Sequence, residues 1–228
     1  MVHFGSDGIC TERNECGYND LTLFPLSVIE KLRKFKFEAG LRGIRYLELR
    51  LLYDEGRIAA EVQRLADEIS HDYADQELVL IVVLKGAFIF AADLVRRIRI
   101  PLSVDFVRLA SYEGTATTGE VSMDKDIDCS LAGKNILVVE DIVDTGLSLS
   151  FLLERLRRRY PQSLKSCALI DKRERRRIDV SLDYSGIVCD HGFLVGYGLD
   201  LDEQCREFPA LYEILPNSSG GGLNDSPM

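Results

Sequence analysis

The sequence predicts an α/β domain with a central, mostly parallel sheet flanked by helices. The main observation is a pair of near-continuous aliphatic runs, at residues 78–84 and 136–139. Strands that are apolar on both faces are typical of parallel sheets, because helices cover both sides of such sheets. A helical stripe precedes the first run, since four aliphatic residues from Ile58 to Ile69 recur at intervals of three or four. Alternating helix and strand patterns of this kind favour a parallel sheet.

The remaining elements follow in order along the chain. Lys85-Gly86 ends the first buried strand, because glycine interrupts the aliphatic run. The polar stretch 111–130 predicts a long loop or a mobile hairpin, and long loops in compact domains are often functional lids. We expect the other elements at residues 87–99 (helix), 104–109 (strand), 135–140 (strand), 147–160 (helix), 166–171 (strand), 187–188 and 193–197 (short strands), with a charged, irregular segment at 172–183.

Both ends of the chain lie outside this pattern. Residues 1–45 are predicted to form an N-terminal extension of unknown role, and residues 46–216 the domain itself. Residues 31–37 mix basic and apolar side chains, which predicts a peripheral helix or a further part of the extension; the alternative is a segment that covers a partner surface. Residues 217–228 are rich in Ser, Gly, Asn and Pro, which predicts a disordered tail.

Composition limits the possible functional classes. The 228 residues are 46% hydrophobic and 29% charged, which suits one sizeable core in a globular protein. The net charge of −9 argues against general nucleic-acid binding, which needs a basic surface. The six cysteines include no C-x-x-C pair and there are only three histidines, which argues against a zinc site. Cys167 and Cys189 lie in apolar runs and are expected to be buried thiols. We expect no secretory signal and no membrane span, and therefore a cytoplasmic protein.

The most informative stretch runs from Val138 to Ser148 and reads Val-Val-Glu-Asp-Ile-Val-Asp-Thr-Gly-Leu-Ser. Its acidic residues follow a buried strand, at the edge where open α/β sheets bind ligands. Its Thr-Gly-x-Ser turn begins a helix, whose first amide groups lack intrahelical acceptors and attract phosphate. Carboxylates beside a phosphate cradle suit a ligand that has sugar hydroxyls, a phosphate and a metal ion.

This stretch resembles the phosphoribosyl pyrophosphate (PRPP) signature of the type I phosphoribosyltransferases. Over roughly residues 48–215, the order and spacing of further segments are similar to those of hypoxanthine-guanine phosphoribosyltransferases of the bacterial type. The resemblance implies a type I phosphoribosyltransferase fold for residues 46–216, with a small hood beside the main sheet. It also implies transfer of ribose 5-phosphate from PRPP to a purine nitrogen. The segments concerned are Leu84-Lys85-Gly86, Ser111-Tyr112, Asp171-Lys172, residues 193–200 and Arg206.

The implied reaction forms an oxocarbenium-like sugar carbon, as glycoside hydrolysis does. The resemblance assigns Glu140 and Asp141 to the ribose hydroxyls and metal-bound water; alternatively they cap the next helix or pair with a lysine. It assigns Asp144 as the general base that accepts the purine N7 proton. The alternative role of Asp144 is a helix N-cap, and the two roles are compatible. The 5′-phosphate would be held by Thr145, Gly146 and Ser148.

The same resemblance implies a pyrophosphate and metal side. Lys85-Gly86 matches a pyrophosphate-binding loop, in which relatives can have a cis peptide before the lysine; the alternative is an ordinary strand-to-helix turn. Arg206 would add a second pyrophosphate contact, although a single arginine is more often simply solvated. Asp200 would help to bind Mg²⁺, directly or through water, together with the acidic pair at 140 and 141.

The purine side is implied by a third group of residues. Lys172 would donate to the purine 6-oxo group; alternatively it belongs to a solvated basic run with the arginines that follow it. Phe193 would stack on the base and the Leu194 backbone would contact its edge, although phenylalanine before a buried run is more often a core residue. Ser111 and Tyr112 lie in the expected lid, which would exclude water from the reacting carbon.

Three functional hypotheses remain at this stage. The first is a purine salvage enzyme with PRPP, hypoxanthine, guanine and pyrophosphate as its ligands, acting as a homodimer or homotetramer. The second is a regulator that keeps the fold to sense nucleotides and binds nucleic acid; the acidic balance and the retained Asp144, Lys172 and Asp200 argue against it. The third is a phosphoribosyltransferase for another base, such as xanthine. The sequence does not rank hypoxanthine against guanine.

Overall fold

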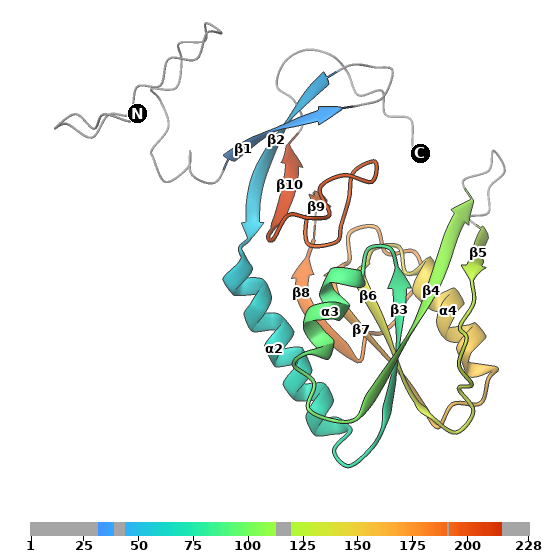
Figure 1. The fold of residues 1–228 in the computed structure, drawn as a ribbon. Coiled ribbons are helices and arrows are strands. Elements are labelled where there is room, and N and C mark those ends of the chain that lie inside the picture. The colour runs from blue at the N-terminus through green and yellow to red at the C-terminus, as the bar shows by residue number, and fades with distance from the viewer. Residues whose placement is uncertain (1–31, 39–43, 113–119, 191, 216–228) are drawn as a thin grey trace, which may run out of the picture.

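The structure is a computed structural model that describes residues 32–38, 44–112, 120–190 and 192–215 (Figure 1). Its main sheet has six strands in the order β5-β4-β3-β6-β7-β8. Neighbouring strands are parallel except for the antiparallel pair β4–β5. The strands are β3 (Leu78–Leu84), β4 (Leu102–Tyr112), β5 (Glu120–Lys125), β6 (Asn135–Val143), β7 (Ser163–Lys172) and β8 (Tyr184–Cys189).

Helices cover both faces of this sheet (Figure 1). Alternate side chains of a strand point to opposite faces. Leu80 and Val82 of β3 accordingly join the core under the first two helices, whereas Ile81 joins the core under the third. The predicted α/β class and mostly parallel sheet are therefore confirmed. The helices are α2 (Glu55–Asp72), α3 (Phe88–Val95) and α4 (Leu147–Arg157).

The predicted elements are present, with some ends displaced. The Asp54 side chain caps α2 by accepting from the Arg57 amide at 2.8 Å, and the aliphatic stripe of this helix is buried. Cys167 and Cys189 are buried as expected, and burial raises the pKa of the Cys167 thiol. The most consequential displacement is in β6. Its pairing with β7 continues to Val143, so the first two acids of the signature lie within the strand rather than after it.

A second, smaller sheet lies above the main sheet as a hood, in the order β1-β2-β10-β9 (Figure 1). The peripheral helix predicted for residues 31–37 is wrong, because residues 32–38 form an antiparallel strand with β2. The alternation of lysine with phenylalanine over residues 34–37 has the period of a strand and was the available signal. Residues 1–31 and the tail at 217–228 lie outside the described residues, and the boundary at 46 stays a prediction. The hood strands are β1 (Leu32–Glu38), β2 (Ile44–Tyr53), β9 (Phe193–Val195) and β10 (Leu211–Leu215).

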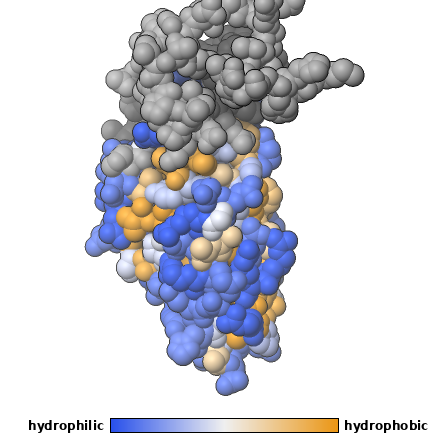
Figure 2. Space-filling view, turned by 90° about the vertical axis from the view of Figure 1, so that its left-hand side faces the viewer, coloured by the Kyte–Doolittle hydropathy of each residue, from blue (hydrophilic) through white to orange (hydrophobic). Residues whose placement is uncertain are grey.

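The outer side of α2 is charged and belongs to the mainly hydrophilic face in Figure 2. Ion pairs along this side include Arg64 with Glu61 and Glu68, at 2.8 and 2.7 Å. Within the described ranges, no helix combines the length and the apolar character needed to cross a membrane. Most side chains on the charged side of α2 are exposed, while the opposite stripe supplies the core.

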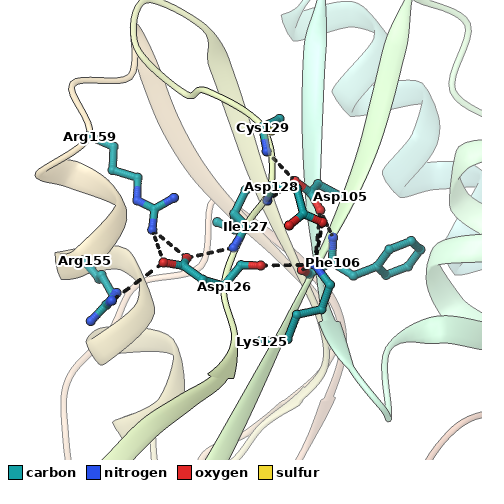
Figure 3. A network of polar contacts seen from close by, with 9 residues as sticks. All are labelled: Asp105, Phe106, Lys125, Asp126, Ile127, Asp128, Cys129, Arg155 and Arg159. Atoms are coloured by element: carbon teal, nitrogen blue, oxygen red, sulfur yellow. Dashed lines mark hydrogen bonds and ion pairs between the residues drawn. The ribbon is translucent and has the colours of Figure 1, made fainter.

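Carboxylates fix the segment that follows the β4–β5 hairpin (Figure 3). Asp105 of β4 accepts hydrogen bonds from the backbone amides of Asp128 and Cys129, at 2.8 and 2.9 Å. Asp126 pairs with Arg159, just beyond α4, through both carboxylate oxygens, at 2.5 and 2.6 Å. The base of the hairpin is thereby tied to β4 and to the end of the helix that begins at the signature loop.

Candidate active site

The signature loop lines a cavity at the carboxyl end of β6. This cavity has a volume of about 120 Å³. Gly146 is the N-cap of α4 and adopts the left-handed backbone, with φ of 82°. Gly146 offers no capping side chain, and the Leu147 amide makes only a long hydrogen bond, at 3.4 Å, to the Thr145 hydroxyl, so the amides of this first turn can bind an anion. The cavity is lined by Glu140, Ile142, Val143, Asp144, Thr145, Gly146, Ser148 and Leu149.

The Asp144 carboxylate stands in this loop with an unused acceptor. Its Oδ1 atom is buried and has no hydrogen-bond partner among the described residues. Its Oδ2 atom lies 3.7 Å from Nη1 of Arg175, whose side chain is largely exposed. The capping alternative for Asp144 is wrong, because Gly146 is the N-cap and no amide of α4 donates to the Asp144 carboxylate. A buried, unpartnered acceptor is costly and suggests that a ligand supplies the missing donor.

Glu140 and Asp141 are neighbouring acids at the end of β6, where Glu140 is buried and Asp141 is partly exposed. Burial raises the pKa of Glu140 well above its usual value, and the neighbouring Asp141 raises it further. Burial also raises the pKa of Asp141, to about 6, although Arg206 and its own backbone hydrogen bonds oppose this. Neither acid caps α4, and neither forms an ion pair with a lysine in the part of the chain that the structure describes. Both alternatives for these acids are therefore unsupported, and the pair is set up to receive a cation or hydroxyl donors.

Lys85-Gly86 lies directly against this acidic pair. A Cβ atom added to Gly86 would overlap the Asp141 carboxyl group, so any larger residue there would have to displace that carboxyl. The carbonyl of Gly86 in turn touches Gly198, where an added Cβ would also collide. The Leu84–Lys85 peptide bond is cis. Three segments distant in sequence thus meet at one edge of the sheet: the β3–α3 turn, the end of β6 and residues 196–200.

Arg206 completes this side of the site. Its guanidinium donates to the Gly198 carbonyl at 2.7 Å and pairs with Asp200 at 2.8 Å. Glu203, which the sequence analysis missed, pairs with both Arg206 and Lys85, at 3.0 and 2.8 Å. In the sequence, only the spacing of Glu203 and Arg206, which are three residues apart, indicates that these two side chains could pair. The two cations predicted to bind pyrophosphate therefore share one carboxylate partner.

Of the residues predicted for the purine, Phe193 and Leu194 belong to the hood, and Lys172 lies at the end of β7. Lys172 is only 7% exposed and donates to the Gly192 carbonyl at 2.8 Å, so it does not belong to a solvated run. Phe193 is 52% exposed, so it is not a core residue, whereas Leu194 is buried. Both start the short strand β9, which pairs with β10. An exposed aromatic ring next to a buried lysine suits a flat, polar ligand.

The expected lid residues lie at the end of β4. Ser111 pairs with Val121 and Tyr112 with Glu120 in the β4–β5 ladder, so the stretch predicted as a loop or hairpin contains a hairpin. Their side chains lie outside the described ones. The lid role of Ser111 and Tyr112 stays a prediction.

The charged segment after β7 is not simply solvated. Arg176 is 17% exposed in its side chain and donates to groups of the signature loop. In the sequence, Arg176 is one of the four arginines that follow Lys172 in the basic run, and this contact was not predicted. No pattern in the run distinguishes Arg176 from its neighbours, because its burial depends on a loop more than thirty residues away.

Comparison with known proteins agrees with this site. A family model described as "Phosphoribosyl transferase domain" matches residues 50–202. The hypoxanthine-guanine phosphoribosyltransferase of Aquifex aeolicus is 40% identical over 176 residues, covering 76% of this chain and 99% of that protein. The hypoxanthine-guanine-xanthine phosphoribosyltransferase of Tritrichomonas foetus is 39% identical, covering 71% and 89%.

A solved structure gives the same result. A hypoxanthine-guanine phosphoribosyltransferase from Bacillus anthracis is 42% identical, with a TM-score of 0.69, and the match covers 73% of this chain and 96% of that one. The matched regions include the signature loop, the cis peptide turn and the segment around Asp200. The chain belongs to the phosphoribosyltransferase family, among the hypoxanthine-guanine phosphoribosyltransferases, and is a transferase of purine salvage.

Proposed function

We propose that the enzyme transfers the 5-phosphoribosyl group from PRPP to hypoxanthine or guanine, giving inosine or guanosine monophosphate and pyrophosphate. The observation that carries this assignment is the buried Oδ1 atom of Asp144, which has no hydrogen-bond partner among the described residues and belongs to the loop that lines the cavity. A purine nitrogen that loses its proton as the glycosidic bond forms needs an acceptor of this kind. The amide groups of Thr145, Gly146 and Ser148, together with the two hydroxyls, hold the 5′-phosphate.

The purine is selected by its 6-oxo group. Lys172 donates to this oxygen, Phe193 stacks on the ring and the Leu194 backbone contacts its edge. Adenine carries a donor at the same position, and two donors facing each other without an acceptor are unfavourable. Relatives with hypoxanthine, guanine and xanthine in their names leave the choice among these oxopurines open.

The pyrophosphate leaves toward Lys85, the Gly86 amide and Arg206. Lys85 and Arg206 neutralise the charge of the pyrophosphate. Because both are paired with Glu203 in the structure, they exchange this carboxylate for the phosphates when the substrate binds. Glu140 and Asp141 accept from the ribose hydroxyls and face the positive charge that develops on the sugar. The buried setting of Glu140 strengthens its interaction with that charge, because electrostatic effects are larger in a low dielectric.

The donor set also fits Mg²⁺. Carboxylate oxygens of Asp141, Glu140 and Asp200 are hard ligands, and the charge of Asp200 raises the pKa of Asp141, which indicates that the two lie close together. Among the described residues no three His, Cys, Asp or Glu side chains converge on one point, so these carboxylates would hold the ion only together with substrate oxygens and water. When bound, Mg²⁺ would neutralise the leaving pyrophosphate.

Three further assignments complete the proposal. Ser111 and Tyr112 belong to a lid that excludes water during transfer. The enzyme acts as a homodimer or homotetramer, which is supported by the apolar side chains of Val104 and Phe106, exposed on one face of β4. It acts in the cytoplasm, without nucleic-acid or membrane partners, and the buried thiol of Cys167 suits a reducing compartment.

The experiment is a pyrophosphate-release assay of the purified protein with PRPP and Mg²⁺. Hypoxanthine, guanine, xanthine, adenine and uracil are compared at equal concentration. We expect turnover with the first two bases and none with adenine or uracil. Turnover with adenine alone, or no turnover with any base while the protein binds duplex DNA, would refute the assignment.

A further inference from the structure

Arg176 connects the loop that carries Asp144 with the end of β7, where Asp171 and Lys172 lie. Its Nε atom donates to the Asp144 carbonyl at 2.9 Å, and its Nη2 atom donates to the Val143 carbonyl at 3.0 Å. The same Nη2 atom pairs with the buried carboxylate of Asp171 at 2.5 Å. Longer hydrogen bonds reach the carbonyls of Lys172 and Val180, at 3.3 and 3.2 Å.

The backbone after Arg176 continues this pattern. The amides of Arg177 and Ile178 both donate to the Thr145 carbonyl, at 2.9 and 3.1 Å. Three consecutive carbonyls, at residues 143–145, are therefore held by the single segment 176–178. In a planar trans peptide, the amide of the next residue points opposite to the carbonyl. The amides of Thr145 and Gly146 consequently point away from this segment.

The signature loop packs closely against segment 176–180 at Gly146. An added Cβ at Gly146 would lie 2.6 Å from the Ile178 carbonyl oxygen and 3.1 Å from Cδ of Arg176. The loop thus rests on segment 176–180 on one side and borders its cavity on the other. A guanidinium suits this position, because it presents five donors in a fixed planar fork, whereas lysine offers a single nitrogen.

We propose that Arg176 is a positioning residue for phosphoribosyl transfer. It does not touch the substrate. It turns the amides of Thr145 and Gly146 toward the 5′-phosphate and fixes the position of Asp144 relative to the purine bound at Lys172. This inference rests on the phosphate cradle proposed above, so its experiment must distinguish a failure of the cradle from a failure of Arg176.

The experiment compares the affinities of guanosine monophosphate and guanosine, which differ only in the 5′-phosphate. Their ratio in the parent enzyme reports the phosphate cradle. In Arg176→Lys, which keeps the charge beside Asp171, we expect this ratio to fall by about ten-fold or more, since several hydrogen bonds orient the cradle. Guanosine affinity should change by only a few-fold. The control is Arg177→Lys, on an exposed side chain of the same segment, which should keep the parent ratio.

The possible outcomes distinguish the role of Arg176 from the existence of the phosphate cradle. A folded Arg176→Lys enzyme with the parent ratio would overturn the role of Arg176. A parent enzyme that binds both ligands equally would overturn the cradle itself, and with it this inference. Arg176→Gln is measured in parallel, so that the result does not depend on one variant folding, and a cooperative thermal transition in each variant establishes that the fold is intact.

Discussion

Replacing Asp144 by asparagine tests the catalytic assignment most directly. The change removes the ability to accept a proton and keeps nearly the same shape. If Asp144 is the general base, kcat should fall by roughly 10²–10⁴-fold, the usual contribution of such a group. That loss corresponds to about 3–5 kcal/mol of transition-state stabilisation.

The structure predicts a much smaller effect on folding. Asp144 does not cap α4, so no cap is lost. Its one ion pair within the described part of the chain, to the exposed Arg175 at 3.7 Å, is worth about 0.5 kcal/mol or less after solvent screening. For a protein of this size, a loss of that order lowers Tm by about 2 °C at most. The expected energies for catalysis and for folding therefore differ several-fold, which makes the test decisive.

The assay measures kcat and the KM of PRPP at saturating hypoxanthine, with Tm from circular dichroism. The KM of PRPP should change little, because the phosphate loop and the acidic pair remain. The matched control is Asp179→Asn, an exposed carboxylate in the adjoining segment, which should behave as the parent. A kcat within a few-fold of the parent would refute the reasoning and leave the mechanism without its base.

Three other predictions follow from the structure. Gly86→Ala places a methyl group where the Asp141 carboxyl lies, and a displacement of that carboxyl by about 1 Å should lower kcat/KM for PRPP by about 10²-fold. The control Gly56→Ala, at the start of α2, has room for the methyl group and should leave kcat/KM unchanged. Asp105→Ala leaves three backbone amides without their acceptor and should cost about 2 kcal/mol in urea unfolding, unlike Asp124→Ala on an exposed side chain. Although burial raises the pKa of Asp105, those amides lower it below its usual value overall, so its stabilisation is full above about pH 4 and should fade as the pH falls further. Excess chelator should abolish turnover and added Mg²⁺ should restore it; full activity in chelator would contradict the proposed metal.

The sequence was sufficient for those parts of the fold that depend on local pattern. The aliphatic runs predicted β3 and β6, and the stripe of α2 predicted its buried face, because each pattern reflects burial over a few consecutive residues. The position of the site also followed, since the carboxyl ends of parallel strands meet at one edge of a sheet. By contrast, the alternation that makes β1 a strand is short, and its partner β2 supplies the pairing that the sequence does not reveal.

The missed residues have one physical feature in common. Arg176 and Glu203 are ordinary charged residues whose roles come from groups far away along the chain. Arg176 contacts Val143 across 33 positions, and Glu203 contacts Lys85 across 118. Loop closure over such distances leaves no periodic trace in either segment. Only the tertiary structure distinguishes these side chains from the exposed charges around them.

The alternation of β6 explains how two neighbouring acids can serve opposite ends of one substrate. Val138 faces the core under α4, and Val139 faces the core under α2 and α3. Continuing this period of two, Glu140 falls on the α4 side, where it lines the cavity of the phosphate loop. Asp141 falls on the opposite side, where it meets Gly86 and the charge of Arg206. In the proposed reaction, the strand thus directs one carboxylate toward the 5′-phosphate side of the ribose and the next toward the departing pyrophosphate. This division requires the strand to continue through both acids, and the β6–β7 pairing to Val143 provides that continuity.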